Sequence, residues 1–510
     1  MSAASDYSRD RQWDRLESAD EPWDIAIIGG GATGVGVAID AASRGYRVAL
    51  CEQHDFGKGT SSRSTKLVHG GVRYLKQGHI GLVRSSLRER GLLRQNAPHL
   101  VRPLANIVPL YSRWEGPYYG LGMKVYDWLS GRLSLGPSQR LSAADTLARI
   151  PTLQPNDLRG GVLYWDAQFD DARLLINMVQ TAIDCGATCV NYAPVRELIK
   201  EQGRVRGLVV EDAETGRSVR VAARVVVNAT GPFSDFVRKL DDPAAEAAIA
   251  ASQGIHLVFD GRFLPGQTAL MVPKTRDGRV IFAIPWHGHT MLGSTDTPIA
   301  DAPLEPRPQR SEIEFLLETV APYLSPAPQA SDIRSTWAGI RPLIRSGKTA
   351  NTAKLGRDHV IRVSASGLVS ILGGKWTSYR KMAEDGVDRA VEVGGLAPAI
   401  CRTANLPISG GTDDTQLEQL ARSQPGWNEA LAPPMPNVAG QVIWAARHEM
   451  ARSVEDVLAR RTRILFLDAD AAIAAAPRVA QLLAAELGHD NAWQAEQLVH
   501  FRQVAENYRA

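Results

Sequence analysis

The chain has 510 residues, of which 44% are apolar and 22% charged, values that exclude a mostly disordered chain, a collagen-like repeat and a disulfide mini-protein. Its 58 basic and 55 acidic residues leave a formal net charge of +3, which argues against a dedicated nucleic-acid-binding protein. At ~150 residues per domain, the length predicts about three domains.

Signals for export, membrane insertion and disulfide bonding are absent from the sequence pattern. Four cysteines are too few for a disulfide framework and fit a reducing compartment, and Cys185 and Cys189 are expected to be small buried apolar residues. Residues 1–22 are predicted to form a polar tail, and they lack the apolar core of a signal peptide. No later run is long and apolar enough to cross a bilayer as a helix, so we expect a soluble or peripherally attached protein.

The first elements after the tail predict a βαβ unit. Residues 24–28 form a short apolar run that ends in three glycines, which is typical of a buried parallel strand. A helix is predicted over 34–44 and a second strand over 46–52. Such a unit of about 30 residues opens a doubly wound α/β fold.

The rest of the chain is predicted to alternate between helices and β-structure before it becomes helical. Helices are expected over 82–93, 173–185 and 311–320, a strand at 187–191, a hairpin over 204–221 and a buried strand at 224–227. Segments 255–299 and 333–372 predict an antiparallel sheet, and Gly373-Gly374-Lys375 opens a helix towards Val393. From about residue 412 the pattern is helical and rich in alanine, which predicts a separate α-helical domain at 400–510.

A dinucleotide-binding fingerprint lies at the first strand–helix turn. Glu52 ends the next strand, where it can accept hydrogen bonds from ribose and disfavour the 2′-phosphate of NADP. An empty βαβ turn is the alternative, but the glycines, the helix start and the acid would all have to coincide. The residues of the fingerprint are Gly29, Gly30, Gly31, Ala32, Thr33 and Gly34.

Two later segments favour FAD over NAD. Residues 225–231 form a strand that ends in a turn of small residues, a pattern similar to the second FAD-side motif of flavoprotein oxidoreductases. Residues 368–377 combine a strand, two glycines and a helix start. The helix dipole and Lys375 there would stabilise negative charge at the N1/O2 edge of a reduced flavin.

Several longer motifs resemble one enzyme family. Residues 60–75, TSSRSTKLVHGGVRYL, resemble the signature of FAD-dependent glycerol-3-phosphate dehydrogenases, and segments 293–297, 337–343, 373–380 and 455–462 resemble further motifs of that family. The resemblance runs from about residue 23 to 467. It departs at Ser294, where the family more often has Thr, and at Trp376, where Leu or Val is more usual.

The resemblance implies a fold and a reaction. The expected fold is α/β, with a Rossmann-like FAD-binding domain interleaved with an antiparallel-sheet substrate region over 23–395, followed by the helical domain. The implied reaction is oxidation of sn-glycerol 3-phosphate to dihydroxyacetone phosphate by hydride transfer to the flavin N5 of non-covalently bound FAD. Electrons would pass to a quinone, which implies a cytoplasmic enzyme held peripherally at the inner membrane.

The resemblance also implies a set of site residues. Arginines suit bidentate phosphate binding, and the substrate set is Arg73, Tyr74, Arg341 and Arg357. A surface salt bridge is the alternative for each arginine, and it is equally weighted for Arg357 because Asp358 follows it. Beyond the fingerprint, the expected cofactor contacts are Thr60, Ser61, Ser62, His69, Gly70, Gly71, Val195, Gly231, Asp296, Gly374, Lys375, Trp376 and Thr377.

The catalytic set is His256, Lys375 and Arg341. A histidine with a pKa near neutrality suits proton abstraction, although His256 stands on an apolar strand and could equally be a core residue. Lys375 is assigned to the flavin rather than to the proton. His287 and His289 are expected in a hairpin turn rather than in a metal site, and no metal is predicted.

Three alternative functions stay open at this stage. A glycerophosphate oxidase would pass electrons to O2, and an amine or amino-acid oxidase would bind a carboxylate without several converging arginines. A flavin-bearing interaction protein would bind FAD without turnover. The helical C-terminal domain could serve dimer contact, membrane docking or structural cover, and a homodimer is an open alternative.

Overall fold

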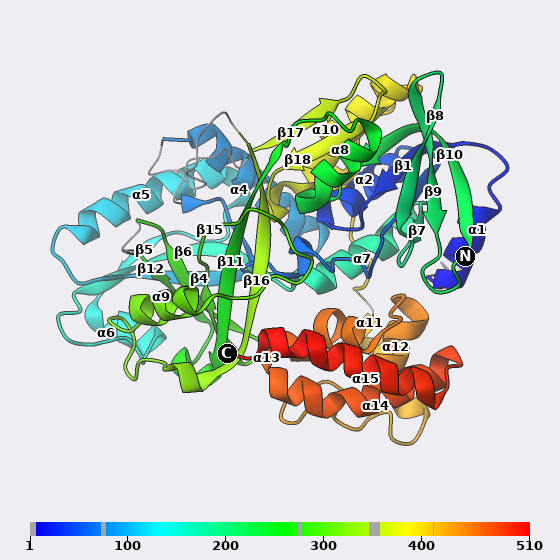
Figure 1. Cartoon of the computed structure of the whole chain (residues 1–510). Helices are drawn as coiled ribbons and strands as arrows, with labels where there is room; N and C mark the ends of the chain where they lie inside the picture. Colours follow the sequence, from blue (N-terminus) through cyan, green and yellow to red (C-terminus); the bar gives the residue numbers. More distant parts are fainter. Residues whose placement is uncertain (1–6, 73–77, 274, 276–277, 346–357, 412) are drawn as a thin grey trace.

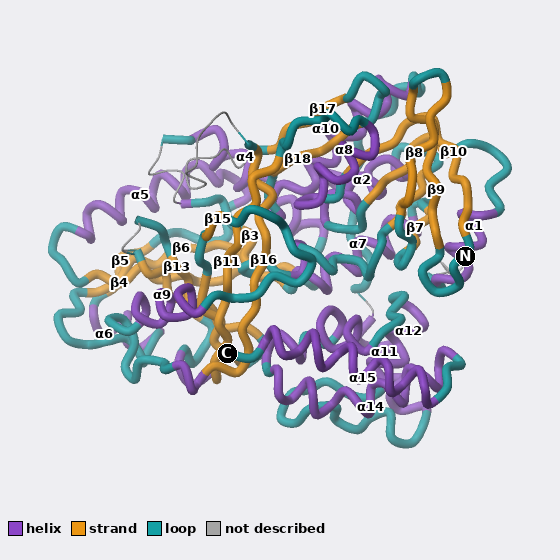
Figure 2. Tube along the Cα trace, in the orientation of Figure 1, coloured by secondary structure: helices purple, strands orange, loops and turns teal. Residues whose placement is uncertain are grey.

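Two mixed β-sheets lie side by side, and a bundle of C-terminal helices packs beneath them (Figure 1). The computed structural model describes residues 7–72, 78–273, 275, 278–345, 358–411 and 413–510. Figure 2 separates the two layers of strands from the helices that cover them. No helix within these ranges is long and apolar enough to cross a membrane.

The first sheet carries the predicted βαβ unit. Its central strands are parallel, whereas β17 is an antiparallel edge strand and a β8–β9 hairpin extends from β10. In the described part of the chain its strands follow the order β17 (His359–Val363), β18 (Val369–Gly373), β10 (Ser218–Asn228), β1 (Trp23–Ile28), β2 (Val48–Cys51) and β7 (Thr188–Val190), with β8 (Val195–Glu201) and β9 (Arg204–Glu211) off this path.

Alternation along β1 divides its side chains between two cores. Ile25 and Ile27 pack with α2 (Ala32–Ser43), α7 (Asp171–Asp184) and α10 (Tyr379–Gly394), as expected for one face of a sheet covered by helices. Ala26 and Ile28 face the opposite core, which the β8–β9 hairpin and an N-terminal helix complete. The hairpin predicted over 204–221 is confirmed by β9 and β10, and the helices predicted over 34–44 and 173–185 are confirmed by α2 and α7.

The predicted polar tail is wrong for residues 9–17, which form α1 (Arg9–Glu17). Trp13 and Leu16 lie three residues apart on one face of this helix and are buried against the first sheet. Arg9 anchors its start through a hydrogen bond to Asp212 at 2.7 Å. The sequence pattern did not indicate this helix because charged residues surround its two apolar side chains.

The second sheet is mostly antiparallel and is built around two long paired strands, β11 and β16. In the described residues its order is β15 (Thr297–Pro298), β11 (Ile249–Asp260), β14 (His289–Gly293), β13 (Ile281–Trp286), β12 (Thr268–Val272), β4 (Val101–Leu110), β6 (Gly160–Phe169) and β3 (Leu67–Val68), with β16 (Ile333–Ile344) on β11 and β5 (Gln139–Leu141) on β6. The antiparallel prediction holds for β16, but β17 and β18 join the first sheet instead, because β18 pairs in parallel with β10.

Helices cover the second sheet and form the C-terminal bundle. Those near the second sheet are α4 (Ile80–Asn96), α5 (Glu115–Ser130), α6 (Ala143–Arg149) and α9 (Arg310–Val320), and α8 (Ser234–Asp241) follows β10. The bundle comprises α11 (Asp413–Ser423), α12 (Gly440–His448), α13 (Ile464–Leu467), α14 (Ala469–Leu487) and α15 (Asn491–Ala505). Its core consists mainly of residues of the bundle and continues into Trp286 and Trp337 of the second sheet, so the helical region packs directly on that sheet.

Candidate active site

A cavity of about 640 Å³ is lined by residues of both sheets, a size in the range of small-molecule and cofactor sites. Most of the predicted site residues line it: Gly29, Gly31, Ala32, Thr33, Glu52, Thr60, Ser61, His69, Gly71, Val195, Gly231, His256, Asp296, Arg341, Gly374, Lys375, Trp376 and Thr377. Gly30, Gly34, Ser62 and Gly70 are not among the lining residues. The predictions for Arg73, Tyr74 and Arg357 fall outside the described residues.

The dinucleotide fingerprint forms the turn between β1 and α2. A side chain at Gly34 would place its Cβ 1.9 Å from the carbonyl oxygen of Gly29, so the helix can approach the strand only with glycine there. At the first turn of α2, the Ala32 N–H donates to Ser61 Oγ at 2.9 Å. The start of α2, with its positive dipole end, therefore lies at the cavity beside the Ser61 hydroxyl.

Glu52 is held in place by backbone amides. Its carboxylate accepts hydrogen bonds from Gly30 N at 2.6 Å and from His54 N at 2.9 Å. Burial raises the pKa of Glu52, and these hydrogen bonds partly offset that effect. The open glycine turn, the helix start and this oriented acid fit the diphosphate and ribose of FAD, and Gly31, Thr33 and Glu52 would hold them.

The segment around His69 and Gly71 is supported from behind by a buried polar cluster. Gly70 N donates to the Tyr126 hydroxyl at 2.8 Å, and that hydroxyl donates to Asp166 at 2.7 Å. Arg90 donates to the same carboxylate at 2.7 Å. Gly70 therefore fixes the turn through its backbone, and the neighbours His69 and Gly71 supply the cavity wall.

Arg341 reaches the cavity from β16 with its guanidinium already oriented. Its Nη2 donates to Ser294 Oγ at 2.6 Å, and its Nη1 lies 3.6 Å from Asp296 Oδ1. The guanidinium lies directly over Gly254, where a Cβ would come within 2.4 Å of Nη2. Its side chain keeps 24% of its surface exposed, so it is accessible to an anionic ligand. Asp296, predicted as a cofactor contact, lies beside this arginine.

His256 is buried in the cavity wall rather than poised near neutrality. Its ring stacks on Trp337 with centroids 4.0 Å apart, and Nε2 lies 2.9 Å from Thr65 Oγ1. Burial, together with the charges of Lys66 and Arg341, lowers the pKa of His256 well below 6.5, which corrects the expected value near neutrality. The Thr65 hydroxyl can donate to Nε2 or accept from it, depending on the imidazole tautomer, and among the described residues the buried Nδ1 has no hydrogen-bond partner.

Lys375 stands where β18 gives way to α10. Gly374 has a φ of +84°, and a Cβ there would lie 2.3 Å from Met382 Sδ, so this turn requires glycine. Lys375 precedes the short turn Trp376–Ser378 that leads into α10, as predicted. Trp376 donates from Nε1 to the Ser61 carbonyl at 2.8 Å and packs edge-on against Phe169, which accounts for tryptophan at this position.

Several cavity-lining residues were missed by the sequence interpretation, and the polar ones among them include Lys58, Arg63, Thr65 and Arg279. Arg63 and Thr65 stand inside the 60–75 motif, but their roles depend on distant partners. Arg63 donates to the Leu304 carbonyl at 2.9 Å and to Glu305 at 2.7 Å. Arg279 carried no motif signal. His287 and His289 flank the β13–β14 hairpin turn as expected, and His287 Nε2 lies 3.2 Å from Asp170.

Replacement of Lys375 by methionine should lower the midpoint potential of the bound flavin. The substitution keeps most of the stem and removes a half-buried charge at the helix start. We expect a fall of about 30–60 mV by potentiometric titration, with hydride transfer slowed in proportion and no new pH dependence. Lys381→Met removes a surface charge of α10 paired with Asp385 and should leave the potential unchanged. An unchanged potential in Lys375→Met would contradict the electrostatic role.

Comparisons with known proteins agree with this geometry. Residues 24–380 match the family model described as FAD dependent oxidoreductase, and residues 411–494 match the C-terminal domain of alpha-glycerophosphate oxidase. A probable mitochondrial glycerol-3-phosphate dehydrogenase of Caenorhabditis elegans is 40% identical over 94% of this chain and 73% of its own length. The mitochondrial glycerol-3-phosphate dehydrogenase of Homo sapiens is 39% identical over 96% and 74%.

Solved structures give the same relationship. The glycerol-3-phosphate dehydrogenase of Bacillus halodurans, complexed with FAD, has a TM-score of 0.78 and 29% identity, and covers 99% of this chain and 98% of its own. The L-alpha-glycerophosphate oxidase of Mycoplasma pneumoniae, at 17% identity and a TM-score of 0.58 over 76% of this chain and 100% of its own, shares the fold. FAD is the cofactor of this chain, which belongs to the FAD-dependent glycerol-3-phosphate dehydrogenase family.

Proposed function

We propose that the chain oxidises sn-glycerol 3-phosphate at C2 to dihydroxyacetone phosphate and passes the electrons to a quinone. The observation that carries this proposal is the presence of Arg341 and His256 in the cavity that also holds the dinucleotide fingerprint and Lys375. The cation of Arg341, suited to a phosphate, and the neutral imidazole of His256, suited to a proton, thus line the same cavity as the proposed cofactor site. FAD, when bound, supplies that acceptor at N5.

The residues of the chain divide the remaining tasks. Arg341 binds the substrate phosphate, and Arg279 adds positive charge to the same cavity. His256, a cavity-lining residue, is our candidate acceptor for the proton of the C2 hydroxyl, since its low pKa keeps the ring unprotonated at neutral pH. Lys375 places positive charge at the start of α10. Arg73, Tyr74 and Arg357 remain proposed substrate contacts.

Anaerobic reduction of the purified holoenzyme tests this function. Glycerol 3-phosphate should bleach the flavin absorbance, whereas glycerol and glycine should not, because they lack the dianion that Arg341 recognises. The reduced enzyme is then mixed with a soluble quinone or with O2. Rapid reoxidation by O2 alone would indicate an oxidase, and bleaching by glycine would indicate an amino-acid oxidase.

Replacement of His256 by alanine should slow flavin reduction and leave the midpoint potential nearly unchanged. The variant loses the proton acceptor, so its rate should recover at high pH, where the substrate hydroxyl loses its proton more readily. Wild-type reduction should show no rise through about pH 6.5, because the His256 pKa lies well below its usual value of 6.5. Stopped-flow measurement of flavin reduction at a series of pH values gives both the recovery of the variant and the pH profile of the wild type. His489→Ala, on the exposed surface, is the control, and a pH-independent loss would leave His256 as a core residue.

Membrane attachment is supported by an exposed apolar stripe on α5, which lies at the outer edge of the molecule in Figure 1. Trp114 precedes the helix and is 84% exposed, and Leu121 and Trp128 are 71% and 79% exposed; Tyr118 and Val125 complete the stripe at helical spacing. A contiguous exposed apolar patch is typical of a protein or membrane contact site. On its buried face, α5 carries Tyr126, whose hydroxyl holds Gly70 beside the cavity.

The charges around the stripe favour an anionic bilayer as its partner. Every exposed charged side chain between residues 113 and 140 is basic, and these are Arg113, Lys124, Arg132 and Arg140. Basic residues beside inserted aromatic and aliphatic side chains are typical of an interfacial helix. These features support our proposal that the chain attaches peripherally to a membrane surface, where a quinone would be accessible.

Introducing aspartate at Trp114, Leu121 and Trp128 together should strongly weaken vesicle binding. Three carboxylates oppose both burial of the stripe and the attraction of anionic lipid, so co-sedimentation with phosphatidylglycerol vesicles should fall about 10-fold or more. Turnover with a water-soluble dye acceptor should stay at the wild-type rate. Ile400→Asp with Val499→Asp, at isolated exposed apolar positions, controls for added charge. Unchanged vesicle binding of the triple variant would exclude α5 as the contact.

A further inference from the structure

We propose that the C-terminal helical domain positions the cofactor-binding segment 54–66, so that its arginines tune FAD and substrate binding rather than only covering the fold. The segment follows Glu52 and contributes a large part of the cavity wall, including Lys58, Thr60, Ser61, Arg63 and Thr65. Three basic side chains of the C-terminal domain hold it from the side away from the cavity: Arg460, Arg461 and Arg463.

The first contact is made at Asp55, three residues after Glu52. Arg461 donates from Nη1 and Nη2 to the two carboxylate oxygens, each at 2.8 Å, and Arg460 donates from Nε at 2.5 Å. All three side chains are at most 3% exposed. Burial alone would raise the pKa of Asp55, but the two arginines outweigh it and the net pKa is lowered, so the carboxylate stays charged.

The second contact is made at Ser62, beside the residues that touch α2 and Trp376. Arg463 donates from Nη2 to the Ser62 carbonyl at 2.8 Å and lies 3.2 Å from Asp171. Lys66 donates to the same carbonyl at 2.8 Å and to Asp171 at 2.7 Å. The Ser62 carbonyl, which precedes Arg63 in the cavity wall, is thus held by two buried basic side chains.

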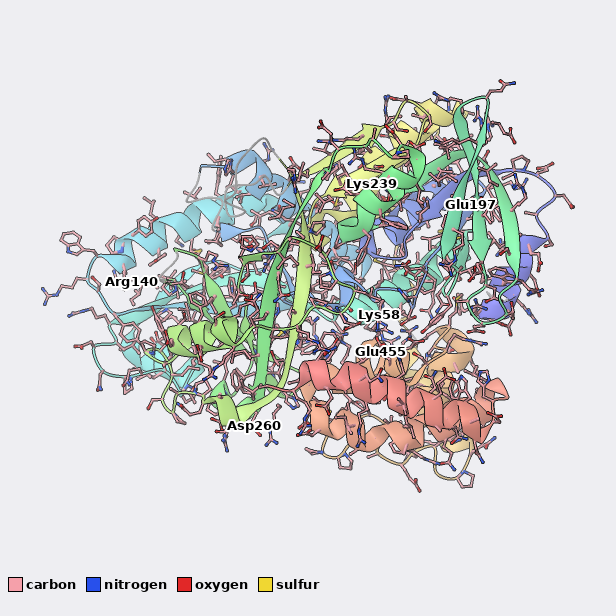
Figure 3. The ribbon with its side chains drawn as sticks, viewed as in Figure 1. Lys58, Arg140, Glu197, Lys239, Asp260 and Glu455 are labelled. Atoms are coloured by element: carbon pink, nitrogen blue, oxygen red, sulfur yellow. The ribbon has the colours of Figure 1, made fainter. Side chains whose placement is uncertain are left out.

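A third contact joins Lys58 to Glu455, and Figure 3 shows these two residues at the junction of the bundle and the body. The Lys58 ammonium lies 2.5 Å from Glu455 and 2.8 Å from Glu305, which also pairs with Arg63. One lysine of the segment therefore links the C-terminal domain to the stretch that Arg63 holds through Leu304. Movement of the bundle would shift the segment at three points.

The backbone that presents these arginines is unusual. Residues Asp456–Arg461 form a π-helix, a form that is rare and frequent at functional sites. Arg463 adopts a left-handed conformation with a φ of +64°, which is strained for a residue with a side chain. A plain structural cap would not need either feature. The arrangement instead directs arginines only one and two residues apart towards one segment.

Replacement of Arg461 by glutamine in the full-length holoenzyme tests this inference. We expect FAD to leave the variant about 10-fold faster or more, as is typical when a residue that orients a ligand-binding group is lost. The rise of free-flavin fluorescence after dilution measures the rate, and the visible circular dichroism of the bound flavin should change at a temperature where far-ultraviolet dichroism shows a folded chain. Arg461→Lys keeps the charge but loses the bidentate geometry, so its release rate should be intermediate.

The matched control is Arg452→Gln. Arg452 lies in the same domain and makes a bidentate contact at 2.6 and 2.7 Å across the same junction, but to Glu214 rather than to the segment. Its FAD release should stay within about twofold of wild type, as for a partly exposed ion pair. Equal release rates in Arg461→Gln and Arg452→Gln would reduce the domain to structural cover and overturn the inference. Neither readout needs substrate, so failure of the proposed dehydrogenase activity would be seen separately.

Discussion

Replacing Arg341 with alanine should lower kcat/KM for glycerol 3-phosphate roughly 30- to 1,000-fold. This corresponds to a loss of transition-state stabilisation on the order of 2–4 kcal/mol. Arg341 is held by Ser294 and Asp296, so its guanidinium is fixed before the substrate arrives. Loss of a charge-assisted contact to a dianion in a partly enclosed cavity is therefore not recovered by water. Steady-state kinetics with glycerol 3-phosphate measure kcat/KM, and the flavin absorbance of the purified protein measures its FAD content.

FAD content should remain near wild type in Arg341→Ala, because the fingerprint and Glu52 do not depend on this side chain. Arg334→Ala is the matched control: Arg334 lies on the same strand, β16, but is exposed and outside the cavity. Its kinetics should match wild type. Loss of flavin with retained substrate affinity in Arg341→Ala would make Arg341 a cofactor or structural residue.

Replacing Asp171 with asparagine should destabilise the folded chain by about 3–5 kcal/mol, the usual cost of breaking a buried ion pair on one side. Asp171 and Lys66 are both fully buried and 2.7 Å apart. The Asp171 carboxylate also accepts hydrogen bonds from Ser64 N at 2.9 Å and Ser64 Oγ at 2.7 Å. The variant retains the shape of the side chain but leaves Lys66 without its carboxylate. Chemical denaturation at fixed FAD concentration measures the loss.

The loss should depend on pH in a defined direction. Burial lowers the pKa of Lys66 from 10.5 to about 7, although Asp171 opposes that effect. Between those values the unfolded chain binds more protons than the folded one, so stability rises with pH. Without Asp171 the folded pKa falls further, and this rise begins at lower pH. The difference in unfolding free energy between wild type and Asp171→Asn should therefore widen as the pH falls below about 7 and stay level above about pH 8.

A double substitution separates the ion pair from simple packing loss. In Lys66→Met with Asp171→Leu, both charges of this pair are replaced by apolar groups, and Arg463, which also contacts Asp171, keeps its hydrogen bonds to the carbonyls of Ala459 and Ser62. The variant should therefore be more stable than Asp171→Asn. Its unfolding free energy should also lose the pH dependence that Lys66 contributes. If the double variant is less stable than the single one and keeps the same pH dependence, Lys66 is not the source of the effect.

Elements that depend on near neighbours in the chain were predictable. The βαβ unit follows from the apolar run at 24–28, the glycine turn and Glu52, because strand, turn and helix signals there are contiguous. The helical C-terminus is equally local, since its alanine-rich pattern has a helical period throughout. The glycine pair before Lys375 also lies at a strand–helix turn as expected. Short contiguous segments were therefore enough to predict the glycine turns and the helix starts that line the cavity.

What the sequence determined by itself is the identity of the local units, including the strand–glycine turn–helix unit that carries the dinucleotide fingerprint. The tertiary structure decided which distant units meet. Only the assembled chain shows α1 buried on the first sheet, β18 paired with β10, Asp296 beside Arg341, and Asp55 enclosed by Arg460 and Arg461. The partners of Asp55 lie about 400 positions away in the chain. Charge and burial at such a site depend on desolvation and pairing across the whole fold, which no local periodicity encodes.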